Sequence, residues 1–255
     1  MKPKPYILAE TNWKTIKGSQ IDLVILPWGA TEAHNYHLPY ATDTIQAEYF
    51  AAEAARIAWE KGAKIMVLPT IPIGVNSGQV DILMDLNFNI STQSAILNDI
   101  IVFLHRQGVK RLLILNGHGG NNFKPILREL GLAYPDMFLV TCDWFRAVDK
   151  RGYFEESGDH ADEMETSLML YLAPELVLSL DQAGEGIERK IKIEGIREGW
   201  AWTERKWTEV TADTGVGDPK KASAEKGKLY FDTVTKKVGE LIYDLATADL
   251  DRLYE

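Results

Sequence analysis

The chain has 255 residues, of which 45% are hydrophobic and 25% charged, and its formal net charge is -9. These values are typical of a globular protein, and lengths of roughly 250 residues are common for one domain, so we expect a single domain over residues 1–255. The acidic balance, without a stripe of Lys and Arg, argues against nucleic acid and a membrane surface as partners.

The single cysteine, Cys142, cannot form an internal disulfide, and its place after an apolar run favours a buried strand end over a reactive thiol. Met1–Glu10 lacks the apolar core of a signal peptide, and the other apolar runs are shorter than the roughly 20 residues that span a bilayer. We therefore expect a cytoplasmic protein.

Short apolar runs alternate with longer amphipathic stretches along the chain. In chain order, strands are expected at Ile21–Pro27, Lys64–Pro69, Arg111–Asn116 and Met137–Cys142. Helices are expected at Thr44–Lys61, Ser91–Gln107, Asn122–Leu132, Ala161–Leu172 and, closing the chain, Ala222–Leu250. The segment Leu176–Thr208 is mixed and compatible with antiparallel strands. Apolar strands separated by helices indicate βαβ units, and hence an α/β fold with a largely parallel sheet covered by helices on both faces.

Three polar clusters lie where these strands end or where a helix begins, which is where open parallel sheets place their ligands. They are WGATEAHNYHLPYATDT at 28–44, NGHGGNN at 116–122 and GDHADEMETS at 158–167. Four of the five histidines lie in these clusters, always beside acidic residues or glycines, whereas scattered structural histidines would not gather in this way. The fifth, His105, ends a predicted helix and is interpreted as a structural residue.

The clusters carry a set of metal-ligand candidates. Glu32 and His34 are two residues apart in an extended segment, so their side chains can point to the same side. The carboxylate of Asp43 is able to bridge two cations, and His118 lies in a glycine-rich loop whose backbone can approach a metal closely. Glu165 is a further candidate. Mixed nitrogen and oxygen ligands favour Zn²⁺, Mn²⁺ or Fe²⁺ over Ca²⁺ or Mg²⁺.

Each candidate has an alternative interpretation. Asp43 could cap a turn, and Glu165 could face water and complement the dipole of its helix. His37 could be a ligand, could orient a ligand, or could contact the substrate. The NGHGG loop could cradle a phosphate, but it lacks the Lys and Ser/Thr of a P-loop.

Four motifs in this order resemble the creatininase (creatinine amidohydrolase) family. They are PWGATEAHNYHLPYATD at 27–43, LNGHGGN at 115–121, GDHADEMETSLML at 158–170 and TGVGDPKKASAEKGK at 214–228. The resemblance implies a three-layer α/β/α sandwich, two divalent metal ions per chain and usually a homohexamer. It implies one metal held by Glu32, Asp43 and His118, and a second held by His34, Asp43 and a further carboxylate.

In true creatininases that last carboxylate lies two positions after the histidine of the NGH motif, where this chain has Gly120. The role is transferred to Glu165, which is also expected to be catalytic, and the departure argues against creatinine itself as substrate. The implied reaction is metal-assisted hydrolysis in which His160 transfers a proton to the leaving nitrogen. Gly119 and Gly120 are expected to offer backbone donors to the substrate, and His37 and Trp144 are expected to contact it. Packing is the alternative role for Trp144, because the chain has seven Trp.

These expectations lead to three hypotheses. The first is hydrolysis of a non-peptide C–N bond in a small molecule, such as a cyclic amide or formamide, with cleavage of a mycofactocin-type peptide as a narrower variant. The second is a metal-dependent phosphoester hydrolase, which would need basic residues near the metals, where Lys124 is the only candidate seen beside the polar clusters. The third is a catalytically inactive family member that binds a metabolite.

Overall fold

The computed structural model describes residues 3–254, and its centre is a parallel β-sheet. Within these residues four strands pair in the order β2-β1-β3-β4, and every pairing is parallel. The strands are β1 (Leu23–Trp28), β2 (Ile65–Val67), β3 (Arg111–Asn116) and β4 (Phe138–Asp143). All six residues of β1 are buried, because helices cover both faces of the sheet.

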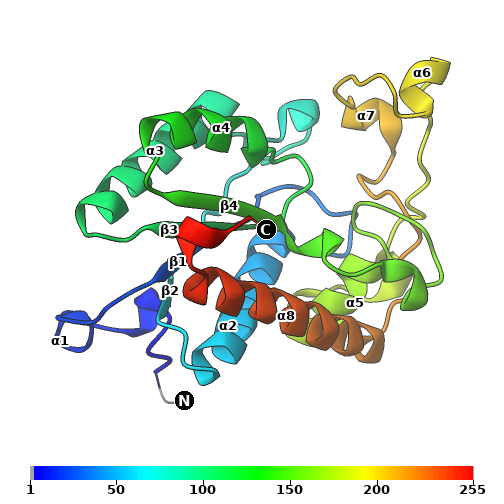
Figure 1. Cartoon of the computed structure of the whole chain (residues 1–255). Helices are drawn as coiled ribbons and strands as arrows, with labels where there is room; N and C mark the ends of the chain where they lie inside the picture. The colour runs from blue at the N-terminus through cyan, green and yellow to red at the C-terminus, as the bar shows by residue number, and fades with distance from the viewer. Residues whose placement is uncertain (1–2, 255) are drawn as a thin grey trace.

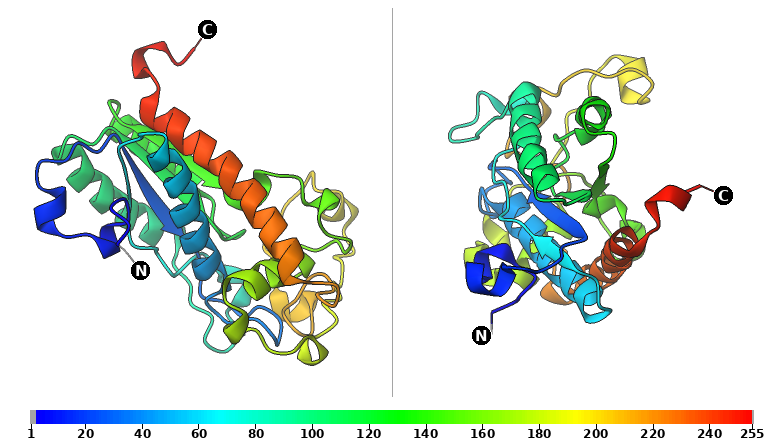
Figure 2. Two further views of the ribbon diagram at one scale, coloured as in Figure 1. Left: turned by 90° about the horizontal axis from the view of Figure 1, so that it is seen from below. Right: turned by 60° about the vertical axis from the view of Figure 1, so that its left-hand side comes forward.

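Two helical layers enclose the sheet, as Figures 1 and 2 show. One face packs against α2 (Thr42–Glu60), α5 (Glu163–Leu172) and α8 (Ala224–Thr247). The other face packs against α3 (Ile90–Arg106) and α4 (Phe123–Ala133). The predicted α/β fold with a mainly parallel sheet and helices on both faces is confirmed.

The segment between α5 and α8 differs from the prediction. Leu176–Thr208 contains only short helices and irregular backbone, including α6 (Glu194–Arg197) and the start of α7 (Trp207–Val210), and no antiparallel strands are found there. Figure 1 shows α6 and α7 standing apart from the main helical layers. Most side chains of this segment are exposed, so it lacks the alternating burial that supports a sheet strand. One further short helix, α1 (Trp13–Ile16), lies near the start of the chain, before β1.

Two further expectations concern single features of the chain. Cys142 is half-buried on β4, and burial raises the pKa of its thiol to about 11, so the thiol is not poised to ionise near neutral pH. No helix among residues 3–254 combines the length and the apolar character needed to cross a bilayer.

Candidate metal centre

The three polar clusters converge at the carboxyl ends of β1 and β3, as the parallel order of the sheet requires. Glu32 and His34 lie in the loop after β1, and Asp43 lies in the first turn of α2, directly after that loop. His118 follows β3, and Glu165 lies in the first turn of α5. The structure thus brings together all five residues that the sequence offered as metal ligands.

His118 is held between a backbone carbonyl and two carboxylates. Its Nε2 lies 3.0 Å from the carbonyl oxygen of Val75, so this nitrogen donates, and Nδ1 presents its lone pair to the other side. Nδ1 lies 2.8 Å from Glu32 Oε1 and 2.9 Å from Asp43 Oδ2. Asn116 at the end of β3 fixes the loop, because its side chain accepts from the His118 backbone N–H and donates to the His118 carbonyl.

His34 is arranged in the same way. Its Nδ1 lies 3.1 Å from the backbone carbonyl of Glu32 and therefore donates, while Nε2 lies 3.1 Å from Asp43 Oδ1. Glu165 Oε2 lies 3.8 Å from the same Nε2. Because ligand histidines in metal sites commonly donate their second ring nitrogen to a carbonyl or carboxylate, both imidazoles have the orientation of metal ligands.

Glu165 turns inward rather than toward water. Its side chain is only 12% exposed, and Oε2 accepts a hydrogen bond of 2.6 Å from the backbone N–H of Ala161. The N-terminus of α5 is capped by Asp162 instead, whose Oδ1 accepts from the Glu165 N–H. The interpretation of Glu165 as a solvent-facing residue that complements the helix dipole is therefore wrong.

The donor set fits a cation between the facing groups. Imidazole lone pairs and carboxylate oxygens are all acceptors, so they repel one another at these distances unless a positive charge lies between them. Asp43 Oδ2 is buried and has no hydrogen-bond partner within residues 3–254, although His118 Nδ1 is 2.9 Å away. Three groups place their ligand atoms within 4.8 Å of one another: Glu32, Asp43 and His118; His34, Asp43 and Glu165; and Glu32, His34 and His160.

Without a cation, protons take its place. Burial opposes the charged form of each group, but the neighbouring carboxylates raise the pKa of His34 to about 10 and that of His118 well above its usual range. Burial, together with the nearby Asp43 carboxylate, raises the pKa of Glu165 to about 8. The pKa of Asp43 is lowered, because the attraction of the two imidazoles outweighs its burial.

His160 lies beside this cluster with one nitrogen free. Its Nε2 donates to the carbonyl of Ala33 at 2.9 Å, and Nδ1 lies 4.0 Å from Glu32 Oε1. The ring is held between His34, with centroids 4.2 Å apart, and Trp207, at 4.7 Å. Burial and the charge of His34 lower the pKa of His160, which favours a neutral imidazole able to accept a proton.

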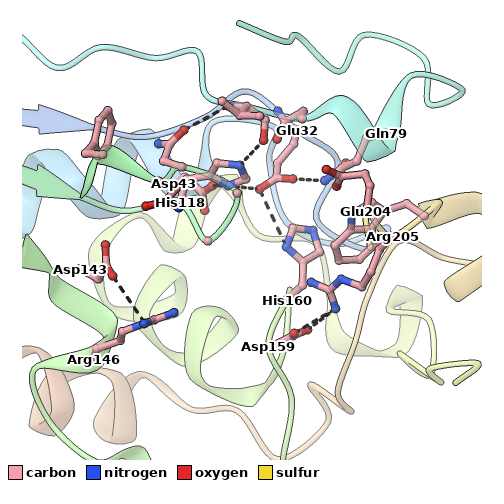
Figure 3. A pocket seen from close by; sticks show the side chains of 18 of the residues that line it. Glu32, Asp43, Gln79, His118, Asp143, Arg146, Asp159, His160, Glu204 and Arg205 are labelled. Atoms are coloured by element: carbon pink, nitrogen blue, oxygen red, sulfur yellow. Dashed lines mark hydrogen bonds and ion pairs between the residues drawn. The ribbon is translucent and has the colours of Figure 1, made fainter. Parts of the chain in front are cut away.

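A cavity of about 460 Å³ opens over the cluster. Glu32, Asp43, His118, His160 and Glu165 line it, and Figure 3 shows the first four of these side chains gathered around it.

Gly119 and Gly120 also line the cavity, as the sequence predicts for backbone donors. Gly120 is closely packed, because a Cβ there would lie 2.3 Å from the Val75 carbonyl oxygen and 2.5 Å from His118 Nε2.

Two residues expected to contact substrate do not reach this cavity. Trp144 is 1% exposed and stacks on Phe50 in the core below α2 and α8, with ring centroids 4.1 Å apart. His37 is buried and pairs through Nε2 with the hydroxyl of Thr166 at 2.8 Å. The structure therefore corrects the substrate-binding role expected of both, because neither is among the residues that line the cavity.

Other lining residues were missed in the sequence. The side chain of Gln79, from a turn between β2 and α3, donates to Glu32 Oε2 and so orients that carboxylate. Arg146 and Arg205 add positive charge to the cavity beside Lys124. All three lie outside the four motifs, in loops without hydrophobic periodicity, so no signal in the sequence pointed to them.

Fold and site together define an α/β protein with a candidate metal centre of the kind used by hydrolases, at the carboxyl edge of a parallel sheet. Residues 9–242 match the family model described as creatininase, creatinine amidohydrolase, and the chain belongs to this family. The resemblance noted in the sequence is thereby confirmed.

Relatives in this family have different activities. The chain is 28% identical to the mycofactocin precursor peptide peptidase of Mycolicibacterium smegmatis, over 84% of this chain and 81% of that protein. It is 28% identical to the creatinine amidohydrolase of Pseudomonas putida, over 68% and 74% of the two chains. It is 27% identical to the 3-dehydro-scyllo-inosose hydrolase of Thermotoga maritima, over 89% and 78%. All three names describe hydrolases, so the family supports hydrolysis without defining the bond.

Solved structures agree with the fold. A Bacteroides fragilis protein assigned as a creatinine amidohydrolase superposes with a TM-score of 0.92 at 44% identity, and 99% of each chain is covered. A mutant creatininase complexed with creatine gives a TM-score of 0.78 at 25% identity, over 96% of this chain and all of the other.

Proposed function

We propose that the chain is a binuclear metal-dependent hydrolase that cleaves a non-peptide C–N bond in a small, polar molecule. The position of Asp43 carries this proposal, because its two oxygens face two different imidazoles, at 3.1 Å from His34 Nε2 and 2.9 Å from His118 Nδ1. Asp43 is thus placed to bridge one cation held with Glu32 and His118 and a second held with His34 and Glu165. The nitrogen and oxygen donors suit Zn²⁺, Mn²⁺ or Fe²⁺.

When bound, a pair of such cations supplies an activated water near neutral pH and polarises a substrate carbonyl. His160 is placed to move the proton that the leaving nitrogen needs. Its Nε2–H is fixed by the Ala33 carbonyl, and Nδ1 is left free beside Glu32 at the cavity. Because its lowered pKa keeps the ring neutral, His160 can accept a proton and pass it on.

The size and polarity of the cavity favour a small substrate. About 460 Å³ is within the usual range for small-molecule sites, and most lining side chains outside the metal ligands are charged or carry amides and hydroxyls. A cyclic amide or a formamide fits such a space better than a polypeptide segment does. Creatinine itself is disfavoured, because Gly120 occupies the position of the carboxylate that true creatininases have and has no room for a side chain.

One alternative gains support from the structure. Phosphoester hydrolysis requires positive charge near the metals, and Arg146 and Arg205 join Lys124 in the cavity. Release of phosphate from simple phosphoesters, without amide hydrolysis, would favour this alternative. A metabolite-binding protein without activity would bind ligands but turn over neither class. The homohexamer implied by the family stays a prediction, which light scattering on the purified chain would test.

The proposal is tested by metal analysis and a matched pair of histidine variants. We expect close to two equivalents of transition metal per chain, and hydrolysis of at least one member of a panel of lactams, hydantoins and formamides. His160→Ala is expected to keep its metal but lose roughly 10² to 10⁴ in rate, as a proton-transfer group does. His105→Ala is the control, because His105 pairs with Asp136 at the protein surface. Wild-type protein that binds no metal would overturn the proposal.

A further inference from the structure

One side of the cavity combines several groups that attract anions. We call this side the β4 wall and define it by the lining residues Gly119–Lys124, Thr141, Asp143 and Arg146. It is formed by the loop after β3, the start of α4, and the end of β4 with the turn that follows. None of the proposed metal ligands belongs to it, and the proposed hydrolysis of a C–N bond gives its two cationic side chains no role.

The cationic side chains of the β4 wall are largely free. The side chain of Arg146 is 70% exposed, and its only ion pair within residues 3–254 is a long contact of 3.5 Å from Nε to Asp143 Oδ2. Its Nη groups therefore remain available to bind an anion; Figure 3 shows Arg146 beside Asp143. Lys124 is exposed and forms no ion pair with any described residue. The Asp143 carboxylate is partly occupied, because Oδ1 accepts from the Asn116 side chain at 2.9 Å.

Neutral donors line the same wall. The backbone N–H groups of Gly119, Gly120, Phe123 and Lys124 have no protein acceptor among residues 3–254. Asn122 precedes the eleven residues of α4 but its side chain does not cap the helix, so the positive end of the helix dipole stays open to the cavity. The hydroxyl oxygen of Thr141, which also lies in this wall, is shielded from solvent and has no hydrogen-bond partner in the described chain.

The opposite side of the cavity has the reverse balance. There Asp159 and Glu204 provide two negative charges, and Arg205 is already paired with Asp159 at 3.0 Å. On the β4 wall two positive side chains, Lys124 and Arg146, face one negative side chain, Asp143. A substrate with an acid group would therefore be oriented with that group toward the β4 wall.

We propose that the β4 wall binds a carboxylate or phosphate group of the substrate, anchored by Arg146 and Lys124, so that the substrate is a small amide carrying an acid group. That the substrate is an amide rests on the proposed hydrolase function. The acid-binding site itself is argued independently, from the contacts of the β4 wall. Planar guanidinium groups and free backbone N–H groups are the donors that carboxylates and phosphates prefer.

The binding site can be tested without a substrate. Inorganic phosphate is titrated by calorimetry into the zinc-loaded full chain and into Lys124→Gln/Arg146→Gln. The control, Arg128→Gln/Arg151→Gln, removes the same charge from exposed residues that do not line the cavity. We expect the dissociation constant of phosphate to rise about tenfold or more in the first variant and less than about twofold in the control. Equal values in all three proteins would overturn the proposal, because phosphate would then bind at the metals alone.

The substrate class is tested with matched pairs. N-formyl amino acids are compared with their neutral carboxamides, and formamides with a phosphate ester are compared with the free alcohols. In at least one pair, wild type is expected to hydrolyse the acidic compound with a kcat/KM about tenfold or more above that of its neutral partner. The pair with the larger ratio shows whether the site binds a carboxylate or a phosphate. The preference should fall below about threefold in Lys124→Gln/Arg146→Gln, and equal kcat/KM for both members of each pair in wild type would overturn the inference. If no compound is hydrolysed while phosphate binding still depends on these two residues, the proposed function fails and the acid-binding site stands.

Discussion

Loading the metal-free protein with metal should release protons, and the structure sets their number. At pH 7 the metal-free chain holds a proton on His34, whose pKa is raised to about 10, and one on His118, whose pKa is raised well above its usual range. Glu165, with a pKa raised to about 8, is roughly nine tenths protonated at that pH. A cation can bind these groups only when they are deprotonated.

The sum is one proton from each histidine and nearly one from Glu165, or about three protons per chain at pH 7. At pH 9 Glu165 has already ionised, and the release should fall to about two. The affinity for metal should accordingly rise with pH, by about tenfold per unit for each proton released.

Calorimetric titration with Zn²⁺ in two buffers of different ionisation enthalpy measures directly, at each pH, how many protons are released per chain. The variant Glu165→Gln provides a comparison, since its release at pH 7 should resemble that of wild type at pH 9. A release of less than about one proton per chain at pH 7, or an affinity independent of pH, would refute the view that His34, His118 and Glu165 hold bound cations.

Further expectations concern stability and metal affinity. Because the pKa values of His34 and Glu165 are raised, the folded metal-free chain binds more protons than the unfolded chain above pH 6.5. Its melting temperature should therefore fall from pH 7 to pH 9, and a rise would contradict the expectation. Gln79→Ala should weaken metal binding by about 10- to 100-fold, measured by competition with a chelator, because it frees the Glu32 carboxylate to turn. Gly120→Ala should weaken it too, whereas Gly119→Ala, with nothing within 4 Å of its Cβ, should retain full metal content; equal losses would contradict the packing argument.

The sequence by itself determined the fold class and pointed to the candidate ligands that the structure brings together. The interior of a strand such as β3, Leu112–Leu115, is apolar without interruption because both faces of the sheet are covered, and this local pattern is readable without coordinates. Since parallel strands bring their carboxyl ends to one edge, motifs that follow different strands had to meet there. The convergence of Glu32, Asp43 and His118 could therefore be predicted from their places after β1 and β3.

Only the tertiary structure decided which side chains face the cavity. Trp144 directly follows a strand, as the candidate metal-ligand clusters do, yet it packs onto Phe50 in the core, whereas Arg146 two residues later faces the cavity. Gln79 and Arg205 reach the site from irregular segments, whose paths depend on contacts with distant residues rather than on local periodicity. Apolar burial repeats along an element and is visible in the sequence, but the direction of a single side chain in a loop is set by the packing around it.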